Sequence, residues 1–315
     1  MKTELDAKAL IIVVCLITIV ASLGSCRPAD KSAGNNHNKL RVIATLFPLY
    51  DIAKNIGAEK ASVSLLLPPG VEPHSFEPTP GDIVKINEAD IFIYTGKFME
   101  PWAERIIKGT ANKNLIVVDA SRGAKMVPGV FRDKNEPAGA LDPHIWLDFD
   151  NVRIMAGNIL QAFLTKDSAD KSFYERKADD YGDKLAELDS AFRTSLAACK
   201  KKEIIYAGHY AFGYLANRYG LKYLAAQGVS PDAEPTARDL GRLVEQINRD
   251  KIKYIYYEEL ASPKIAETIA GETGAELLML NAAHNLARDQ FEKGISFFDI
   301  LRNDLDNLKI GLECR

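Results

Sequence analysis

Histidine and cysteine are scarce in this chain of 315 residues, which contains five of the first and four of the second. No local motif such as C-x-x-C or H-E-x-x-H brings them together, and no serine nucleophile elbow is present. The sequence therefore shows neither a local zinc motif nor a recognisable hydrolase motif. Any site built from these side chains must be assembled by the fold.

An excess of charge is also lacking. Lysine and arginine number 40 and aspartate and glutamate 43, which gives a formal net charge of -3. The short run CKKKE is interpreted as the solvated end of a helix rather than as a basic patch. A nucleic-acid partner is therefore not expected. With 47% hydrophobic residues, the chain is long enough for two globular domains of ordinary size.

A long hydrophobic run occurs near the N-terminus, in ALIIVVCLITIVASL. It is short for a membrane-spanning helix and suits the core of a signal peptide. It leads into LGSC, where Cys26 follows two small residues, as in the lipobox of bacterial lipoproteins. We expect residues 1–25 to be a lipoprotein signal peptide, Cys26 to be lipidated, and residues 26–38 to be a flexible tether. An uncleaved anchor helix is the alternative, and both place the folded part outside the cytoplasm.

Two cysteines remain for the folded part, Cys199 and Cys314. In an oxidising compartment a leftover pair suggests a disulfide bond, which would join the C-terminus to the end of a helix. Two free buried thiols are the alternative, because spacing alone does not decide the matter.

Apolar strand-like runs alternate with helical ones in two parts of the chain. The expected strands are LRVIAT, ASVSLLLP, DIFIYTG and NLIVVDAS in the first part, and KEIIYAG, KYLAAQG, IKYIYYEE and AELLML in the second. Continuously apolar strands separated by helices favour parallel sheets covered on both faces. The predicted fold class is α/β, with Rossmann-like lobes over residues 39–167 and 200–315.

One long helix, residues 168–199, is expected to join the lobes. Proline is absent from it, and apolar residues recur at helical steps. These residues are Phe173, Tyr181, Leu185, Leu188, Phe192 and Leu196. At about 1.5 Å per residue the helix would be roughly 48 Å long, enough to run the height of a two-lobed molecule. Such a rigid connection predicts small lobe motion rather than wide hinge closure.

Proline is concentrated after the second expected strand, with five of the fourteen prolines between residues 68 and 80. Proline lacks a backbone donor and disfavours helix in the residue before it, so this segment is expected to be a stiff, extended loop. The stretch GVEPHSFEPTP places His74 in this loop. A rigid loop can hold such a side chain at low entropic cost.

Four of the five histidines follow expected strands or lie in turns, whereas His37 lies in the tether. The four are His74, His144 in LDPHIWLD, His209 in YAGHYAFGY and His284 in LNAAHN. Open α/β sheets bind ligands at the carboxyl ends of their strands, so two loops from each lobe would meet in a cleft. Four neutral imidazoles suit tetrahedral zinc. Residue types alone leave a metal site and unrelated loop histidines equally open.

Segments spread over roughly residues 40–313 carry a resemblance to a known family. They include VIATLFPLYDIAKNIG, PPGVEPHSFEPTPGDIVKINEADIFIYTG, DPHIWLD, AGHYAFGYLANRYGL, VSPDAEPTARDL and IYYEE, in this order. The chain resembles the zinc and manganese substrate-binding lipoproteins of bacterial ABC importers. The resemblance implies one divalent metal bound in the cleft between two α/β lobes that a rigid helix joins.

The same resemblance implies the ligands. The family's G-x-x-P-H loop matches His74, its P-H-x-W-x-D motif matches His144, and the residue after the first strand of its second lobe matches His209. Its fourth ligand is commonly an aspartate, where this chain has His284. An all-nitrogen site favours Zn2+ and would also accept copper or nickel. Zinc-type members often carry a long loop rich in histidine and acidic residues before the second ligand, and its absence here keeps Mn2+ open.

Three carboxylates near these histidines are candidates for supporting contacts. Asp142, Asp148 and Glu258 are expected to hydrogen-bond ligand imidazoles and fix their tautomers, as carboxylates around metal sites commonly do. Helix capping and surface roles are the alternatives.

The expected function is capture of a divalent metal and its delivery to an ABC permease that a cytoplasmic ATPase drives. The protein is expected to be a monomer, held at the membrane by its lipid, and not an enzyme. Protonation of the ligands near a pKa of about 6.5 should weaken binding in mild acid. One alternative is a zinc hydrolase with three histidine ligands and Glu258 or Asp142 as base. A surface adhesin is another.

Overall fold

The structure, a computed structural model, describes residues 39–129, 141–229, 231 and 234–315. The expected signal peptide, the tether and Cys26 lie outside the described residues. Residues 39–315 form one compact unit that contains two sheets of four strands each. Within the described residues, no helix combines the length and the apolar character that crossing a membrane requires.

The first half of this unit alternates strands and helices. In chain order its elements are β1 (Leu40–Ala44), α2 (Phe47–Gly57), η1 (Ala58–Lys60), β2 (Ala61–Leu65), α3 (Pro80–Glu88), β3 (Ile91–Tyr94), α4 (Ala103–Gly109), β4 (Ile116–Asp119), η2 (Ile145–Leu147) and α5 (Phe149–Lys166). A short turn, η3 (Ser168–Asp170), then leads into the long helix α6 (Lys171–Ala197).

The second half repeats the alternation. Its elements are β5 (Glu203–Tyr206), α7 (Gly213–Arg218), β6 (Lys222–Ala225), α8 (Ala237–Asp250), β7 (Tyr254–Glu258), α9 (Lys264–Thr273), β8 (Glu276–Leu280), α10 (Arg288–Glu292) and α11 (Phe297–Gly311).

Both sheets are parallel and have the same strand order. The first runs β2-β1-β3-β4 and the second β6-β5-β7-β8, and each neighbouring pair is parallel. The predicted α/β class with two parallel sheets and a long helix is confirmed. In each sheet the direction of the strand order reverses between the second and third strands. These are β1 and β3 in the first sheet and β5 and β7 in the second. The carboxyl ends of these strands are where such sheets bind ligands.

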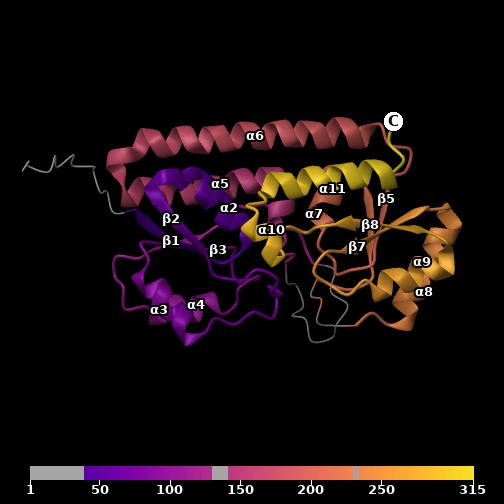
Figure 1. The fold of residues 1–315 in the computed structure, drawn as a ribbon, viewed down its shortest axis with the longest axis horizontal. Helices are drawn as coiled ribbons and strands as arrows, with labels where there is room; N and C mark the ends of the chain where they lie inside the picture. The colour runs from indigo at the N-terminus through magenta and orange to yellow at the C-terminus, as the bar shows by residue number, and fades with distance from the viewer. Residues whose placement is uncertain (1–38, 130–140, 230, 232–233) are drawn as a thin grey trace, which may run out of the picture. The chain divides into compact units, whose positions relative to one another are not determined.

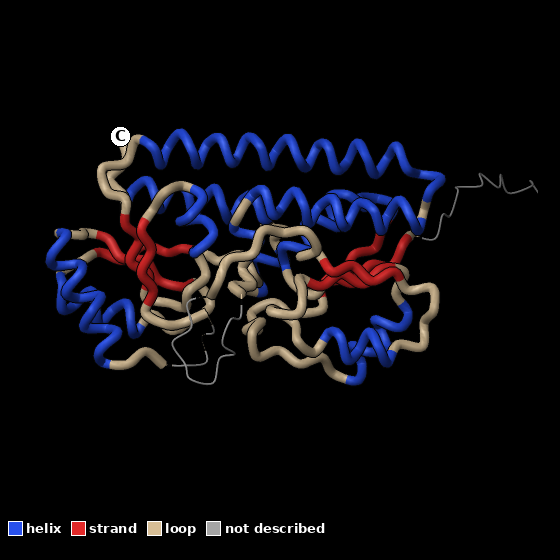
Figure 2. The backbone as a smooth tube through the Cα atoms, turned by 180° about the vertical axis from the view of Figure 1, so that it is seen from behind, coloured by secondary structure: helices blue, strands red, loops and turns tan. Residues whose placement is uncertain are grey.

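Helices cover both sheets. Figure 1 shows α6 running along one side of the unit, and α6 packs on α2, α5 and α11. Figure 2, from behind, shows the same helical layer, with α3 and α4 on the side of the first sheet away from α6. The second sheet packs its other face on α8 and α9 through a separate apolar cluster. Covering on both faces accounts for the continuously apolar strands.

The largest buried apolar cluster extends through both halves and includes one face of α6. The buried apolar residues of that face are Tyr174, Tyr181, Leu185, Leu188, Phe192 and Leu196. Phe173, expected in this stripe, is only partly buried, and its neighbour Tyr174 takes the buried position and donates its hydroxyl to Asp167 Oδ2 at 2.8 Å. The helix also begins after residues 168–170, which form η3. A shared core makes α6 a rigid connection.

The C-terminus returns to the end of α6. A disulfide bond joins Cys199 to Cys314, and the backbone N–H of Lys201 donates to the carbonyl of Leu312 at 3.0 Å. The C-terminal label therefore lies beside the end of α6 in Figure 1.

Candidate metal centre

His74 lies in the proline-rich segment between β2 and α3, and it remains partly exposed. At the far end of this segment Thr79 caps α3 by accepting a hydrogen bond from the backbone N–H of Asp82. The backbone N–H of His74 itself donates to Glu72 Oε1 at 3.0 Å. These contacts and the prolines hold the loop in place without regular secondary structure.

Asn285 ties the segment that carries His74 to the segment that carries His284. Its side-chain amide donates to the carbonyl oxygens of Pro68 and Val71, at 2.9 and 2.8 Å. Asn285 is fully buried, so water cannot replace these two hydrogen bonds. The loops that carry a histidine from each half are therefore joined directly to one another.

His144 is fully buried at the start of η2, and Asp142 fixes it. Oδ1 of Asp142 accepts from the backbone N–H of His144 at 3.0 Å and lies 2.7 Å from its Nδ1. Tyr214 of α7 donates its hydroxyl to the Asp142 carbonyl at 2.8 Å, which binds this turn to the second half. Burial raises the pKa of Asp142 to about 7, against the lowering effect of the His144 backbone. With Nδ1 engaged, Nε2 of His144 is left to bind a ligand.

His209 follows β5, and Glu258 at the end of β7 fixes it. The two Glu258 carboxylate oxygens lie 2.9 and 3.0 Å from His209 Nδ1. Gly208 makes this approach possible, because a Cβ there would lie 2.7 Å from Glu258 Oε2 and 2.6 Å from the Tyr206 ring. The strands β5 and β7 are neighbours, so the pair lies where the connections of the second sheet diverge.

The Nε2 atoms of three histidines converge. Nε2 of His144 lies 3.3 Å from that of His74 and 3.2 Å from that of His209. Nitrogens placed tetrahedrally around zinc, at about 2.0 to 2.1 Å each, are about 3.3 to 3.4 Å apart. Carboxylates engage the opposite nitrogens of His144 and His209, so Nε2 lone pairs face one another at the centre. These residues fit a divalent ion.

His284 lies beside this group and is not a member of it. Its ring centroid is 5.6 Å from that of His209, and its side chain is fully buried. Neither Nδ1 nor Nε2 has a hydrogen-bond partner among the described residues. Its ligand atom instead groups with carboxylate oxygens of Glu72 and Glu258, all within 4.8 Å of one another. A buried imidazole with two unpartnered nitrogens is costly unless something else binds it.

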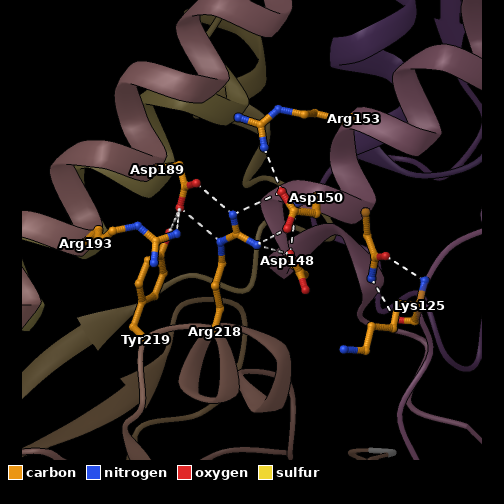
Figure 3. Close-up of polar contacts among 9 residues, drawn as sticks. Lys125, Asp148, Asp150, Arg153, Asp189, Arg193, Arg218 and Tyr219 are labelled. Carbon is orange, nitrogen blue, oxygen red and sulfur yellow. Dashed lines mark hydrogen bonds and ion pairs between the residues drawn. The ribbon is translucent and has the colours of Figure 1, made fainter.

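Asp148 lies away from the histidines. Its side chain caps α5 by accepting from the backbone N–H of Asp150 at 2.9 Å, and it binds Arg218 at 2.7 Å. Arg218, at the end of α7, also binds Asp150 and, on α6, Asp189 (Figure 3). The structure therefore does not give Asp148 the expected contact with a ligand imidazole. Asp148 instead binds the Arg218 guanidinium, which connects α5, α6 and α7.

Electrostatics keep most of these imidazoles neutral. Burial lowers the pKa of His74, His144 and His284 well below the ordinary value. Burial acts the same way on His209, but the charge and hydrogen bond of Glu258 outweigh it and raise the pKa of His209. Burial opposes ionisation of Glu258, yet His209 lowers the pKa of Glu258 to about 2. Neutral imidazoles carry the lone pair that a metal ion requires.

Glu72 was not among the residues predicted from the sequence. Its position two residues before His74, in a loop that prolines stiffen, was the available signal. The loop turns at residues 73–75, and the backbone N–H of His74 donates to the Glu72 carboxylate there. The carboxylate of Glu72 lies near His284 and Glu258, in a group of ligand atoms separate from that of His74.

The two lobes, each with a parallel sheet, and the histidines that follow their strands define a two-lobed metal-binding protein. More particularly, the chain belongs to the ZnuA family, described as zinc-uptake complex component A, periplasmic, whose family model matches residues 42–311. The family resemblance inferred from the sequence is confirmed. This is a family of metal-binding transport proteins and not of enzymes.

Individual relatives cover nearly the whole chain. It is 36% identical over 310 residues to the high-affinity zinc uptake system protein ZnuA of Bacillus subtilis (strain 168), across 96% of this chain and 97% of the relative. The metal-dependent lipoprotein YcdH of Bacillus subtilis superposes with a TM-score of 0.76 at 38% identity, over 87% of this chain and 99% of that one. The Zn(II)-bound ZnuA-like domain of Streptococcus pneumoniae AdcA gives 0.75 at 32% identity, over 87% and 99%.

Proposed function

We propose that this protein captures zinc outside the cytoplasm and delivers it to an ABC importer. The observation that carries the proposal is the convergence of three Nε2 atoms at 3.2 and 3.3 Å. His74 and His144 belong to the first half and His209 to the second, so one ion held by all three joins both halves. Similarity to proteins named for zinc uptake and to a Zn(II)-bound domain supports zinc as the ion.

His284 is the proposed fourth ligand. Its two nitrogens are buried and unpartnered among the described residues, and its ring lies 5.6 Å from that of His209. A small movement of its segment toward the ion would complete a tetrahedron of four nitrogens. A water molecule in the fourth position is the competing arrangement, and the affinity of a His284→Ala variant separates the two.

The donor set favours zinc over manganese. Three imidazole nitrogens form the centre, whereas manganese prefers sites rich in oxygen ligands. Asp142 and Glu258 hydrogen-bond the far nitrogens of His144 and His209. In this role they hold the imidazoles in the tautomer that presents Nε2, and loss of such a partner typically weakens metal binding roughly 10- to 100-fold.

The same contacts disfavour the hydrolase alternative. A catalytic zinc site needs a base directed at the metal-bound water. Both Glu258 oxygens are within 3.0 Å of His209 Nδ1, on the side of the ring opposite the Nε2 that faces the centre. Glu258 therefore supports a ligand and is poorly placed to activate water.

The proposed setting is a membrane surface. Proteins of this family act with a permease and an ATPase, and relatives are named as lipoproteins. We extend this to lipidation of Cys26, which would keep a monomeric protein next to its permease. Mass spectrometry of the membrane-extracted protein tests the lipid, and a mature chain without an acyl group on Cys26 contradicts it.

Metal analysis with competitive titration tests the central proposal. The purified protein is expected to contain one zinc ion and to prefer zinc to manganese. His144→Ala should reduce zinc affinity by at least roughly 100-fold, because it removes a ligand together with the partner of Asp142. His37→Ala is the matched control, since it removes the histidine of the tether, and it should bind as the unchanged protein does. Retention of tight zinc binding by His144→Ala would overturn the proposal.

A further inference from the structure

The histidine cluster has a second group of ligand atoms beside it. We propose that Glu72, Glu258 and His284 form a transit position through which zinc enters and leaves the three-histidine centre. The inference rests on the proposed function and adds a path to it. His284 belongs to both positions, as the fourth ligand of the loaded centre and as a member of the transit group.

The geometry supports two adjoining positions. One ligand atom from each of Glu72, Glu258 and His284 lies within 4.8 Å of the others, and the same holds for the three converging histidines. Glu258 bonds His209 at 2.9 Å, so the two groups share a boundary. Both nitrogens of His284 are buried and without a hydrogen-bond partner among the described residues. An ion in either position would satisfy one of them.

Exposure indicates the direction of the path. His144, His209 and His284 are fully buried, and Glu258 is 5% exposed. Glu72, in the proline-rich loop, is only partly buried. Of the three transit residues, Glu72 is therefore the one that meets solvent. An ion arriving from outside can therefore meet the carboxylate of Glu72, in the same loop as the partly exposed His74, before the buried imidazoles of His144, His209 and His284.

The charge of the group suits an arriving dication. Glu258 contributes a carboxylate that is almost fully buried and lies 2.9 Å from His209 Nδ1. A second carboxylate, that of Glu72, adds to the negative potential in partly buried surroundings, where charge attracts counter-ions more effectively than in water. Two oxygens and one nitrogen form a harder ligand set than three imidazoles, and such a set holds zinc less tightly.

The transit group also explains how a buried ion can leave. An ion held by three or four imidazoles loses several bonds if it dissociates in one step. Zinc can expand from four to five ligands, so Glu72 can bind before a histidine lets go. Glu72 is already in place for this, because its carboxylate accepts the backbone N–H of His74 at 3.0 Å. Each step then exchanges one ligand for another, and the barrier falls in both directions.

Stopped-flow kinetics on Glu72→Gln test the transit position. Zinc association, and dissociation into excess chelator, should both slow roughly tenfold with the affinity unchanged, because both directions cross a barrier that the lost transit ligand raises by about 1.4 kcal/mol. Glu77→Gln is the matched control, since Glu77 lies in the same loop but pairs with Arg105 at 3.5 Å on the surface. It should keep both rates. Glu72→Asp, which retains the charge on a shorter side chain, should recover part of the rate.

Two outcomes would overturn the inference. If Glu72→Gln dissociates faster and binds correspondingly more weakly, Glu72 is an ordinary ligand of the loaded centre. If neither rate changes, zinc takes another path. Cobalt loading gives a readout that folding defects do not mimic. In the unchanged protein, the weak absorption spectrum of a five- or six-coordinate ion should precede the strong spectrum of the tetrahedral ion. Glu72→Gln should lose the weak early spectrum. Tight zinc binding by His144→Ala would instead contradict the proposed function, so failure of the transit position and failure of the proposed function give different results.

Discussion

The indole N–H of Trp146 donates to the backbone carbonyl of Ala282 at 2.7 Å. Trp146 lies two residues after His144, and Ala282 lies two residues before His284. The bond therefore connects a ligand turn of the first half to a ligand segment of the second without involving an ion. A centre held in this way before metal arrives loses less conformational entropy on binding.

Trp146→Phe should weaken zinc binding. The change leaves the buried carbonyl of Ala282 without its donor, which costs about 1 to 3 kcal/mol of unfolding free energy. The segment that carries His284 is then less well positioned, and zinc affinity should fall roughly tenfold, equivalent to about 1.4 kcal/mol. Tyr174→Phe is the control, because it removes the bond to Asp167 next to α6. Calorimetric titration and urea unfolding should show a stability loss in both variants but an affinity loss only in Trp146→Phe.

Asn285→Ala should speed zinc dissociation from the metal centre more than removal of a comparable asparagine elsewhere in the fold. Asn158 provides the comparison, because its amide also donates to two backbone carbonyls, at 3.1 and 2.9 Å. Asn285→Ala should lose about 1 to 3 kcal/mol of stability because Asn285 is fully buried, and Asn158→Ala should lose less because Asn158 is partly exposed. Zinc should dissociate faster from Asn285→Ala alone, since Asn285 joins the loops of His74 and His284. Equal dissociation rates in the two variants would show that Asn285 is only structural.

The strand ends that carry the histidines could be predicted from the sequence, because an apolar strand followed by a turn is a short-range pattern. The neighbours of those histidines were harder to predict. Asp142 is two residues from His144, and its contact follows from local chain geometry. The partner of Asp148 is Arg218, 70 positions away, and nothing local indicates that pairing. Phe173 and Tyr174 are adjacent aromatic residues, and the apolar pattern does not decide which of them faces the core. The sequence predicts Phe173 there, whereas Tyr174 is the buried residue.

Arg218→Met should destabilise the fold strongly. The guanidinium side chain is 9% exposed and binds Asp148, Asp150 and Asp189. Without it three carboxylates repel one another, and removal of one partner of a buried ion pair costs about 3 to 5 kcal/mol. Urea unfolding at neutral pH measures the loss. Arg153→Ala is the control, because Arg153 is an exposed partner of Asp150 and should cost at most about 1 kcal/mol.

Acid should remove the contribution of Arg218. Its hydrogen bonds lower the pKa of Asp150, and they lower that of Asp189 against the opposing effect of burial. A lowered carboxyl pKa gives stability that is fully present above the unfolded pKa, about 3.9, and is lost as pH falls through the folded value. The difference in unfolding free energy between the unchanged protein and Arg218→Met should therefore shrink below about pH 4. A difference that stays constant into acid would contradict the assignment.

Glu100 should give the opposite pH dependence. Burial raises its pKa to about 7, although the Thr45 hydroxyl and the backbone N–H groups of Thr95 and Gly96 donate to it. The folded protein then binds a proton that the unfolded chain releases near pH 4.3, so stability falls as pH rises from about 4 to about 7. Glu100→Gln should flatten this slope in urea unfolding. The control variant Glu104→Gln, at an exposed position, should keep the same slope of stability against pH.

The disulfide bond at the end of α6 also determines how the folded part responds to a pulling force. A force between its two ends enters at β1 and leaves at Cys314, which is bonded directly to Cys199. Tension passes along the first half and α6 and then crosses the sulfur bridge. Residues 200–313, including His209 and His284, lie outside the loaded path. Stretching the chain from its ends therefore cannot pull residues 200–313 out into an extended chain while the bridge is intact.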